Sequence, residues 1–227
     1  MKRLSSISLH LAAGWALVII TLGLIGFWVP PREETIGESY LILFFHVPSA
    51  VSCMILYVLA GCLSLCYLLR RAPLCDFLAA SAVEVGMLGC TITLVTGSVW
   101  ARAAWGTWWE ASDPRLTTVA VMWLMYMGYL ALRTSVDEPG KRASFSAVYA
   151  LLATLNVPLV HFAISLFGRV RHHDQVTMAQ GEMVFTRRFG ILAFLVLYTA
   201  IWRLRCRAHR LRHETRALEE DFLKSGI

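Results

Sequence analysis

Charged residues are scarce in this chain of 227 residues: only 16% are Asp, Glu, Lys or Arg, whereas soluble domains carry about 25%. The mean hydropathy is +0.60 and 57% of the residues are hydrophobic, which is more than a core of this size can hide. The composition excludes an ordinary soluble domain and indicates a protein solvated largely by lipid. The net charge of +6 does not indicate a nucleic-acid partner, because the basic residues flank the apolar runs, as membrane proteins use them to set orientation.

Several chemical signatures are also missing. The six cysteines form no CxxC or CxxCH spacing, so a disulfide framework, a zinc site and covalent haem attachment are unsupported. Buried structural thiols are the simplest interpretation. The sequence has no nucleophile–base arrangement and no phosphate-binding loop. We therefore predict no catalytic residues and no enzyme activity.

Apolar runs long enough to cross a bilayer as helices predict the fold class. The first run follows Met1-Lys2-Arg3 but is too long for a signal peptide and has no small-residue cleavage site. We expect an all-α, polytopic integral membrane protein, with a six-transmembrane-helix bundle over residues 1–204. The tail, 205–227, is basic and then acidic, which is typical of an amphipathic helix or a frayed end. The six predicted spans are 8–29, 40–69, 78–99, 117–134, 144–168 and 184–204.

The distribution of Lys and Arg predicts the orientation. With the N-terminus inside, 14 of the 21 basic residues fall in inner segments. Because positive charge favours the cytoplasmic side, both termini are predicted to be cytoplasmic. The outward segments are then 30–39, 100–116 and 169–183.

The tryptophan loop, residues 100–117, holds four of the eight tryptophans within ten residues. Tryptophan favours membrane interfaces, which explains scattered indoles but not this cluster. Indoles beside arginines suit a large planar anion such as haem, whose edge carries two propionates. Asp113 is expected to position Arg115 or to cap the fourth span rather than to touch the ligand. The predicted ligand-binding residues of the loop are Trp100, Arg102, Trp105, Trp108, Trp109, Asp113 and Arg115.

Two histidines lie inside apolar spans near the outer side. His46 is about six residues into the second span and His161 about seven residues before the end of the fifth, so both are roughly 9–10 Å deep at 1.5 Å per residue. Two neutral imidazoles at one depth can ligate a haem iron from its two faces. Alternatively, each is a hydrogen-bonded core histidine. Pro48 and Pro158 lie close by, and a carbonyl freed by proline could hold the second ring nitrogen.

Other polar residues have more than one interpretation. His172 or His173, on the third outward segment, could hand on a ligand, touch a partner or simply be solvated. Glu84, in the third span, is expected to snorkel or to hydrogen-bond within the bundle rather than to act in catalysis.

These motifs together resemble the CcmC family of haem-handling membrane proteins, which share a tryptophan-rich "WWD" motif. The matching segments are Leu94-Val-Thr-Gly97-Ser98-Val-Trp100, Trp105-Gly-Thr-Trp-Trp109, Asp113-Pro-Arg-Leu-Thr117, Phe45-His46-Val-Pro48 and Asn156-Val-Pro-Leu-Val-His161. The family usually has a third tryptophan before the aspartate, where this chain has Glu110-Ala111-Ser112 and is one residue longer.

The resemblance implies haem b, bound non-covalently and transiently at the periplasmic face of the bacterial inner membrane. His46 and His161 match the axial iron ligands. The implied partners are the haem chaperone CcmE, which receives haem for cytochrome c biogenesis, the CcmA/CcmB ABC-type complex, the small protein CcmD, and membrane lipid. Whether haem is translocated or only received is left open.

Two other functions fit the sequence less well. A b-type electron-transfer subunit commonly has haem ligands at more than one depth, and only one suitable depth is visible. A solute transporter fits the proline-interrupted spans, but the conspicuous polar groups lie near the outer surface rather than at the midplane.

Overall fold

The computed structural model describes residues 2–28, 38–167 and 181–225, and every regular element in these ranges is helical. Six spans in the described residues are long and apolar enough to cross a membrane, which confirms the predicted all-α fold class. The elements are α1 (Lys2–Trp28), the 3₁₀ helix η1 (Glu38–Ile42), α2 (Leu43–Arg70), α3 (Pro73–Trp105), α4 (Pro114–Ser135), α5 (Pro139–Thr154), α6 (Asn156–His161), α7 (Ala163–Phe167) and α8 (Gly181–Ser225).

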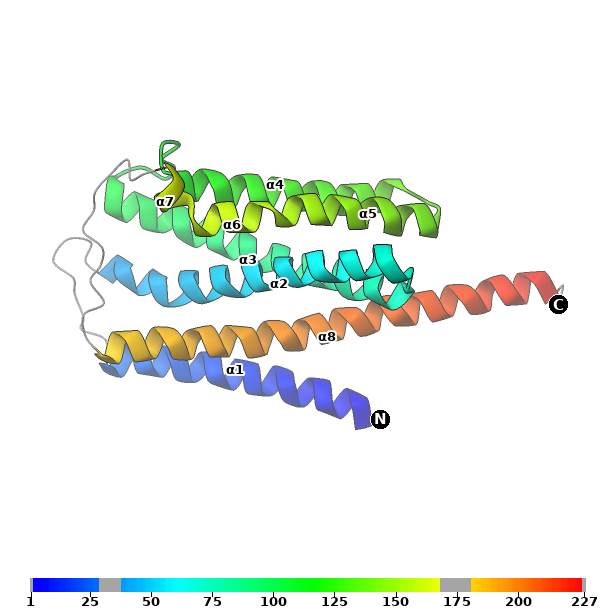
Figure 1. Cartoon of the computed structure of the whole chain (residues 1–227). Coiled ribbons are helices and arrows are strands. Elements are labelled where there is room, and N and C mark those ends of the chain that lie inside the picture. The colour runs from blue at the N-terminus through cyan, green and yellow to red at the C-terminus, as the bar shows by residue number, and fades with distance from the viewer. Residues whose placement is uncertain (1, 29–37, 168–180, 226–227) are drawn as a thin grey trace.

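The helices run roughly parallel to one long axis (Figure 1). Helix α2 is central and packs against α3, α5 and α8, while α1 pairs with α8 and α4 packs against α3 and α5. The described ends of α1 and α8 nearest the two termini lie on the same side of the bundle as the short α2–α3 and α4–α5 connections (Figure 1). We call this side the terminal end and the opposite side, where α3 joins α4, the tryptophan end.

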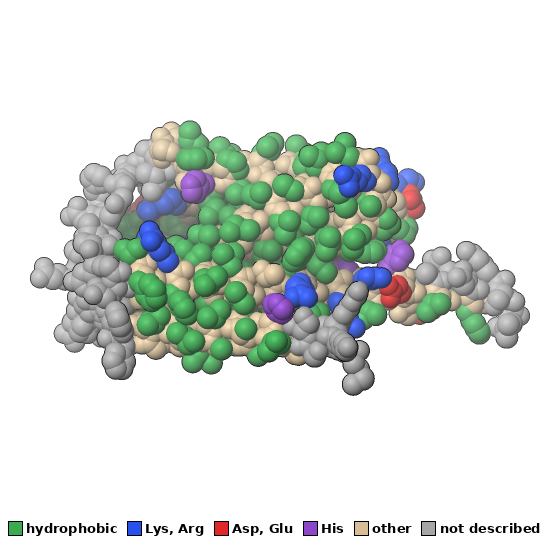
Figure 2. Space-filling view, turned by 60° about the horizontal axis from the view of Figure 1, so that its bottom comes forward, with side chains coloured by type: hydrophobic (Ala, Val, Ile, Leu, Met, Phe, Trp, Pro, Cys, Tyr) green, Lys and Arg blue, Asp and Glu red, His purple; other side chains and the backbone are tan. Residues whose placement is uncertain are grey.

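Close helix packing depends on small residues, as is usual in membrane bundles. A Cβ at Gly86 would stand 2.6 Å from the ring of Tyr57, and one at Gly14 would stand 2.7 Å from the backbone of Leu197. The ring of Tyr57 stacks on that of Tyr126 at 3.6 Å between centroids. Apolar side chains also cover most of the surface drawn in Figure 2, as lipid contact requires.

Two ionic contacts join the helices toward the terminal end. Glu84 on α3 accepts hydrogen bonds from Arg205 Nε (2.7 Å) and His209 Nε2 (3.1 Å) on α8, which confirms its predicted role within the bundle. Asp76 accepts two bonds from Arg133, at 2.5 and 3.0 Å. This pair joins α3 to α4 and was not anticipated from the sequence.

Two predicted spans are bounded or divided differently in the structure, and the tail follows one of its two predicted alternatives. Helix α3 continues to Trp105 instead of ending near residue 99, because alanines favour the helix until Gly106 ends it at φ 75°. The fifth span divides into α5, α6 and α7, since Pro158 has no N–H and its ring crowds the carbonyl four residues earlier. The tail is helical to Ser225 within α8, so the amphipathic-helix alternative holds over its described residues.

The six cysteines are all free, in agreement with the absence of a predicted disulfide framework. The prediction of buried thiols holds for Cys53, Cys75 and Cys90 but is wrong for Cys62, which is exposed. A thiol behaves as a small hydrophobe, so its exposure on a helix surface facing lipid carries little cost.

Candidate functional site

His46 lies in the first turn of α2, at the tryptophan end, and is half-buried. Its Nδ1 is 2.9 Å from Thr96 Oγ1 on α3. The predicted partner, a backbone carbonyl freed by proline, was therefore wrong. Pro48 removes the helical donor of the Phe44 carbonyl, and that oxygen instead lies 3.3 Å from the point where a Cβ at Gly190 of α8 would stand.

The hydrogen bonds of Thr96 determine which nitrogen of His46 carries the proton. Thr96 Oγ1 donates to the carbonyl of Ile92 at 2.7 Å. A hydroxyl has one proton and two acceptor lone pairs, so Oγ1 must accept from Nδ1–H of His46. The Nε2 atom of His46 then has its lone pair unprotonated and available to a metal ion.

Gly97 makes room for the imidazole. A Cβ at this position would stand 3.2 Å from His46 Cε1 and 3.7 Å from Leu116 Cδ2 on α4. Any side chain at position 97 would therefore push against the ring. Helices α2 and α3 therefore set the position of His46, and Leu116 of α4 lies beside Gly97.

Trp100 and Trp105 lie on the last turns of α3 and pack edge to face, with ring centroids 5.2 Å apart. Both indole Nε1 atoms are buried without a hydrogen-bond partner among the described residues. A buried N–H left without an acceptor costs about 1–3 kcal/mol, so each such donor requires an explanation. Both atoms are enclosed by protein, so an anionic ligand would supply the missing acceptors once the indoles turn.

Asp113 and Arg115 form a compact unit at the start of α4. The carboxylate of Asp113 accepts from the backbone N–H of Arg115 at 2.9 Å, which caps the helix, and from its Nε and Nη2 at 3.1 and 2.7 Å. Both functions predicted for Asp113 are thus present. The guanidinium of Arg115 also lies 6.0 Å from the centroid of the Trp105 ring, and its side chain keeps 47% exposure.

The pKa of Asp113 reflects this environment. Burial alone would raise the pKa of the carboxyl, but the hydrogen bonds and positive charge of Arg115 outweigh burial and hold the pKa below its usual value. Asp113 is therefore ionised at neutral pH, and the pair leaves Arg115 with the unused part of its guanidinium facing outward.

The remaining residues of the tryptophan loop are more exposed. Arg102 donates to the carbonyl of Gly106, which closes the end of α3. Trp108 and Trp109 are 59% and 41% exposed. Their indoles are therefore open to a partner or ligand rather than used in the packing of the bundle.

The segment Glu110-Ala111-Ser112 forms a turn rather than a continuation of the aromatic wall. The N–H of Asp113 donates to the carbonyl of Glu110 at 3.0 Å, and Ser112 Oγ donates to the Glu110 carboxylate at 2.5 Å. Thr117 Oγ1 ties the turn to α4 through the Ala111 carbonyl at 3.0 Å. The extra residue is absorbed here, so Asp113 still caps α4.

His161 ends α6 at the same end of the bundle (Figure 1). Its side chain is exposed, and its ring contacts that of Phe162 edge-on at 4.8 Å. No residue in the described ranges forms a hydrogen bond with it. Asn156, at the other end of α6, donates to the carbonyl of Thr118 on α4 at 3.1 Å, and this contact positions the short helix.

The structure brings four of the predicted residues into direct contact. Trp105 packs against Trp100 on one side and against Arg115 on the other, and Arg115 is paired with Asp113. His46 lies near this group, because Gly97 adjoins both the His46 ring and Leu116, the residue after Arg115. His161 lies on α6, which packs mainly on α4 and also contacts α5 and α2. His172 and His173 lie outside the described residues.

Sequence reasoning missed Thr96 and Gly97. Both lie in the segment Leu94–Trp100, which was recognised as a motif, but their contacts with His46 depend on the register of α2 against α3. Two of the described histidines at the terminal end, His10 and His209, are bonded to Arg203 and to Glu84.

The tryptophan end therefore holds an unprotonated imidazole nitrogen, two buried indole donors without a partner among the described residues, and a half-exposed guanidinium. Figure 2 shows a recess near this end with basic side chains at its margin. These groups suit a planar ligand that has a Lewis-acidic metal centre and anionic substituents.

Comparison with known proteins agrees with this chemistry. A family model described as CcmC, heme exporter protein C, matches residues 1–222. "Heme exporter protein C" of Bradyrhizobium diazoefficiens is 32% identical over 213 residues, which cover 91% of this chain and 80% of that protein. The proteins of the same name from Paracoccus denitrificans and Escherichia coli K12 are 31% and 30% identical and cover 96% and 93% of this chain, and 92% and 88% of their own lengths. The chain is a multi-pass membrane protein that belongs to the heme exporter protein C family.

Proposed function

We propose that this protein binds haem non-covalently at the tryptophan end and presents it to a partner for cytochrome c maturation. The observation that carries the proposal is the hydrogen bond from His46 to Thr96, because it leaves Nε2 free as an iron ligand. The relatives that match over most of the chain are named for haem export. In this proposal haem b is cargo and the protein is not an enzyme.

His46 supplies one axial ligand and Thr96 orients it. A metal-bound histidine commonly donates its second ring N–H to an acceptor, which fixes the tautomer and raises the basicity of the ligating nitrogen. Thr96 is such an acceptor. Gly97 leaves the space in which the ring sits.

The tryptophan loop holds the periphery of the ligand. Trp105, Trp108 and Trp109 offer indole area for stacking. Turning of Trp100 and Trp105 would expose their unpartnered N–H groups to the ligand. Arg115 and Arg102 supply positive charge for the two propionates. Asp113 acts indirectly, because its two bonds to the Arg115 side chain hold that guanidinium in place.

His161 supplies the second axial ligand. Its imidazole is exposed, and Phe162 is the one aromatic ring that it contacts among the described residues. A ligand held so loosely can leave the iron without breaking other bonds. This suits a protein that must release its cargo.

We also propose the cellular setting that the family resemblance implies. The haem site lies at the periplasmic face of the bacterial inner membrane. Both termini are cytoplasmic, an orientation that the distribution of Lys and Arg supports. The haem chaperone CcmE collects the haem, and the CcmA/CcmB ABC-type complex and CcmD are the other partners. His172 or His173 on the third outward segment contributes to transfer.

Visible spectra of the purified protein test the site. We expect wild type to show a low-spin, six-coordinate haem, and His46→Ala and His161→Ala to lose haem or this signal. His213→Ala, an exposed histidine at the terminal end, is the matched control and should leave the spectrum unchanged. An unchanged spectrum in both site variants would refute the ligand assignment.

A further inference from the structure

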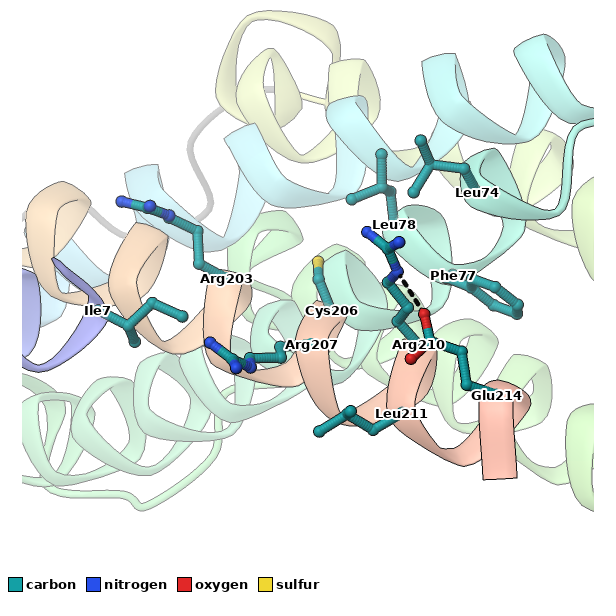
Figure 3. A pocket seen from close by; sticks show the side chains of 10 residues that line it. All are labelled: Ile7, Leu74, Phe77, Leu78, Arg203, Cys206, Arg207, Arg210, Leu211 and Glu214. Atoms are coloured by element: carbon teal, nitrogen blue, oxygen red, sulfur yellow. Dashed lines mark hydrogen bonds and ion pairs between the residues drawn. The ribbon is translucent and has the colours of Figure 1, made fainter. Parts of the chain in front are cut away.

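A cavity of about 530 Å³ lies at the terminal end, remote from the tryptophan loop, between α1, α3 and α8 (Figure 3). It lies where α8 changes from apolar residues to a run rich in arginine, starting at Arg203. The cavity is therefore at a membrane–water boundary. Its lining is Ile7, Leu74, Phe77, Leu78, Arg203, Cys206, Arg207, Arg210, Leu211 and Glu214.

Three arginines share the face of α8 that lines the cavity. Arg203, Arg207 and Arg210 are spaced by four and three residues, which places them on one side of a helix. Arg210 is paired with Glu214 at 2.8 Å, as the dashed line in Figure 3 marks. Arg203 donates to His10 Nε2 at 3.3 Å, and Arg207 has no ion pair with any described residue. Among the described residues, the two guanidinium charges of Arg203 and Arg207 therefore have no ion-pair partner at the cavity.

The nearby carboxylates are already used. Glu84 binds Arg205 and His209, and Asp76 binds Arg133. Neither is available to neutralise the arginines of the cavity. Among the described residues that line the cavity, the one carboxylate, Glu214, is paired with Arg210, so the positive charge of Arg203 and Arg207 suits an added anion.

The opposite wall is apolar. Ile7 of α1 and Leu74, Phe77 and Leu78 of α3 line it, and Leu74 is 56% exposed. A small soluble anion would leave this wall unused. An amphipathic anion would use both the arginines and the apolar side chains.

We propose that this cavity binds an anionic phospholipid from the leaflet at the terminal end. Arg203 and Arg207 contact the phosphate, because a guanidinium matches phosphate oxygens bidentately. The first part of an acyl chain lies against Ile7, Leu74 and Leu78. Basic pockets between transmembrane helices are suited to anionic headgroups, and about 300–1,000 Å³ is the usual size of a ligand pocket.

Native mass spectrometry of the detergent-solubilised full chain tests the site, with phosphatidylglycerol and phosphatidylcholine titrated separately. Wild type should retain one phosphatidylglycerol at concentrations where phosphatidylcholine is lost. Arg207→Gln should weaken phosphatidylglycerol binding about tenfold, the scale of one charge-assisted hydrogen bond. Equal retention of the two lipids by wild type would overturn the proposal.

Arg212→Gln is the matched control, because Arg212 is exposed on the same helix and does not line the cavity. An equal loss in this variant would mean diffuse charge attraction and would overturn the proposal. Leu74→Trp fills the cavity without changing charge, and exposed Leu74 can be replaced without repacking the core. It should also lose phosphatidylglycerol. Displacement of the lipid by an equal concentration of glycerol phosphate would instead assign the cavity to a soluble anion.

Discussion

Replacing Thr96 by valine tests the proposed haem site at its least obvious residue. The change keeps the shape of the side chain and removes only the hydroxyl. His46 Nδ1–H then loses its acceptor at 2.9 Å, and the ring loses the bond that fixes its tautomer and orientation. Loss of such a supporting bond typically lowers metal affinity by about 10–100-fold. We expect a decrease of this size in haem affinity.

The measurement is a haem titration followed by visible absorbance, with the spin state of the bound haem as a second readout. Thr96→Ser should restore affinity close to wild type, because serine keeps the hydroxyl. Thr91→Val is the matched structural control. Thr91 also donates to a helix carbonyl, at 2.8 Å, and accepts an N–H, from Trp123 at 2.9 Å, but it does not contact His46.

If Thr96→Val bound haem as wild type does, the orientation of His46 by Thr96 would be irrelevant to binding. If Thr96→Ser failed as badly as Thr96→Val, the hydroxyl would not be the cause. If Thr91→Val caused the same loss, the effect would be one of general stability. Each of these results would refute the reasoning from the hydrogen bond.

Three further predictions concern other contacts. Gly97→Ala places a Cβ 3.2 Å from His46 Cε1, so haem affinity should fall in the same titration, and an unaffected affinity would contradict the packing. The pKa of Asp113 is lowered from its usual value, so its ion pair with Arg115 stabilises the tryptophan loop fully above about pH 4. This stabilisation is lost as the pH falls through the lowered pKa. Tryptophan fluorescence should report this acid transition, and Asp113→Asn should abolish it. The Sγ atoms of Cys66 and Cys75 are 2.8 Å apart, so copper(II)-phenanthroline should oxidise the two thiols to one disulfide with loss of two hydrogens and of two maleimide-reactive groups, which Cys66→Ser should prevent.

The helical fold was largely predictable because lipid imposes one simple rule. Each span needs about 20 apolar residues, whatever its neighbours are, and this property is local in sequence. The boundaries were less predictable. Trp100 and Trp105 were expected in a loop outside the membrane but are helical, since helix propensity and the stop at Gly106 decided where α3 ends.

The candidate site was only partly predictable for a related reason. His46 was identified because an ionisable residue in an apolar run stands out. The role of Thr96 was not identified, because hydroxyl side chains are common in membrane helices. Whether such a hydroxyl orients a histidine depends on which residue of α2 lies opposite it. The two unpartnered indole donors likewise appear only once Trp100 and Trp105 pack together.

The two histidines are held unequally, and this difference predicts the order in which haem loses its ligands. His46 is half-buried, bonded to Thr96 and packed against Gly97, whereas His161 is exposed at the end of a six-residue helix. Rotation of His161 breaks no hydrogen bond with the described residues, so it should leave the iron first. We expect His161→Ala to retain haem in a five-coordinate state and His46→Ala to lose most of its haem, as measured by haem content and spin state after gel filtration. The reverse order would show that the burial of His46 does not determine how firmly it holds the cargo.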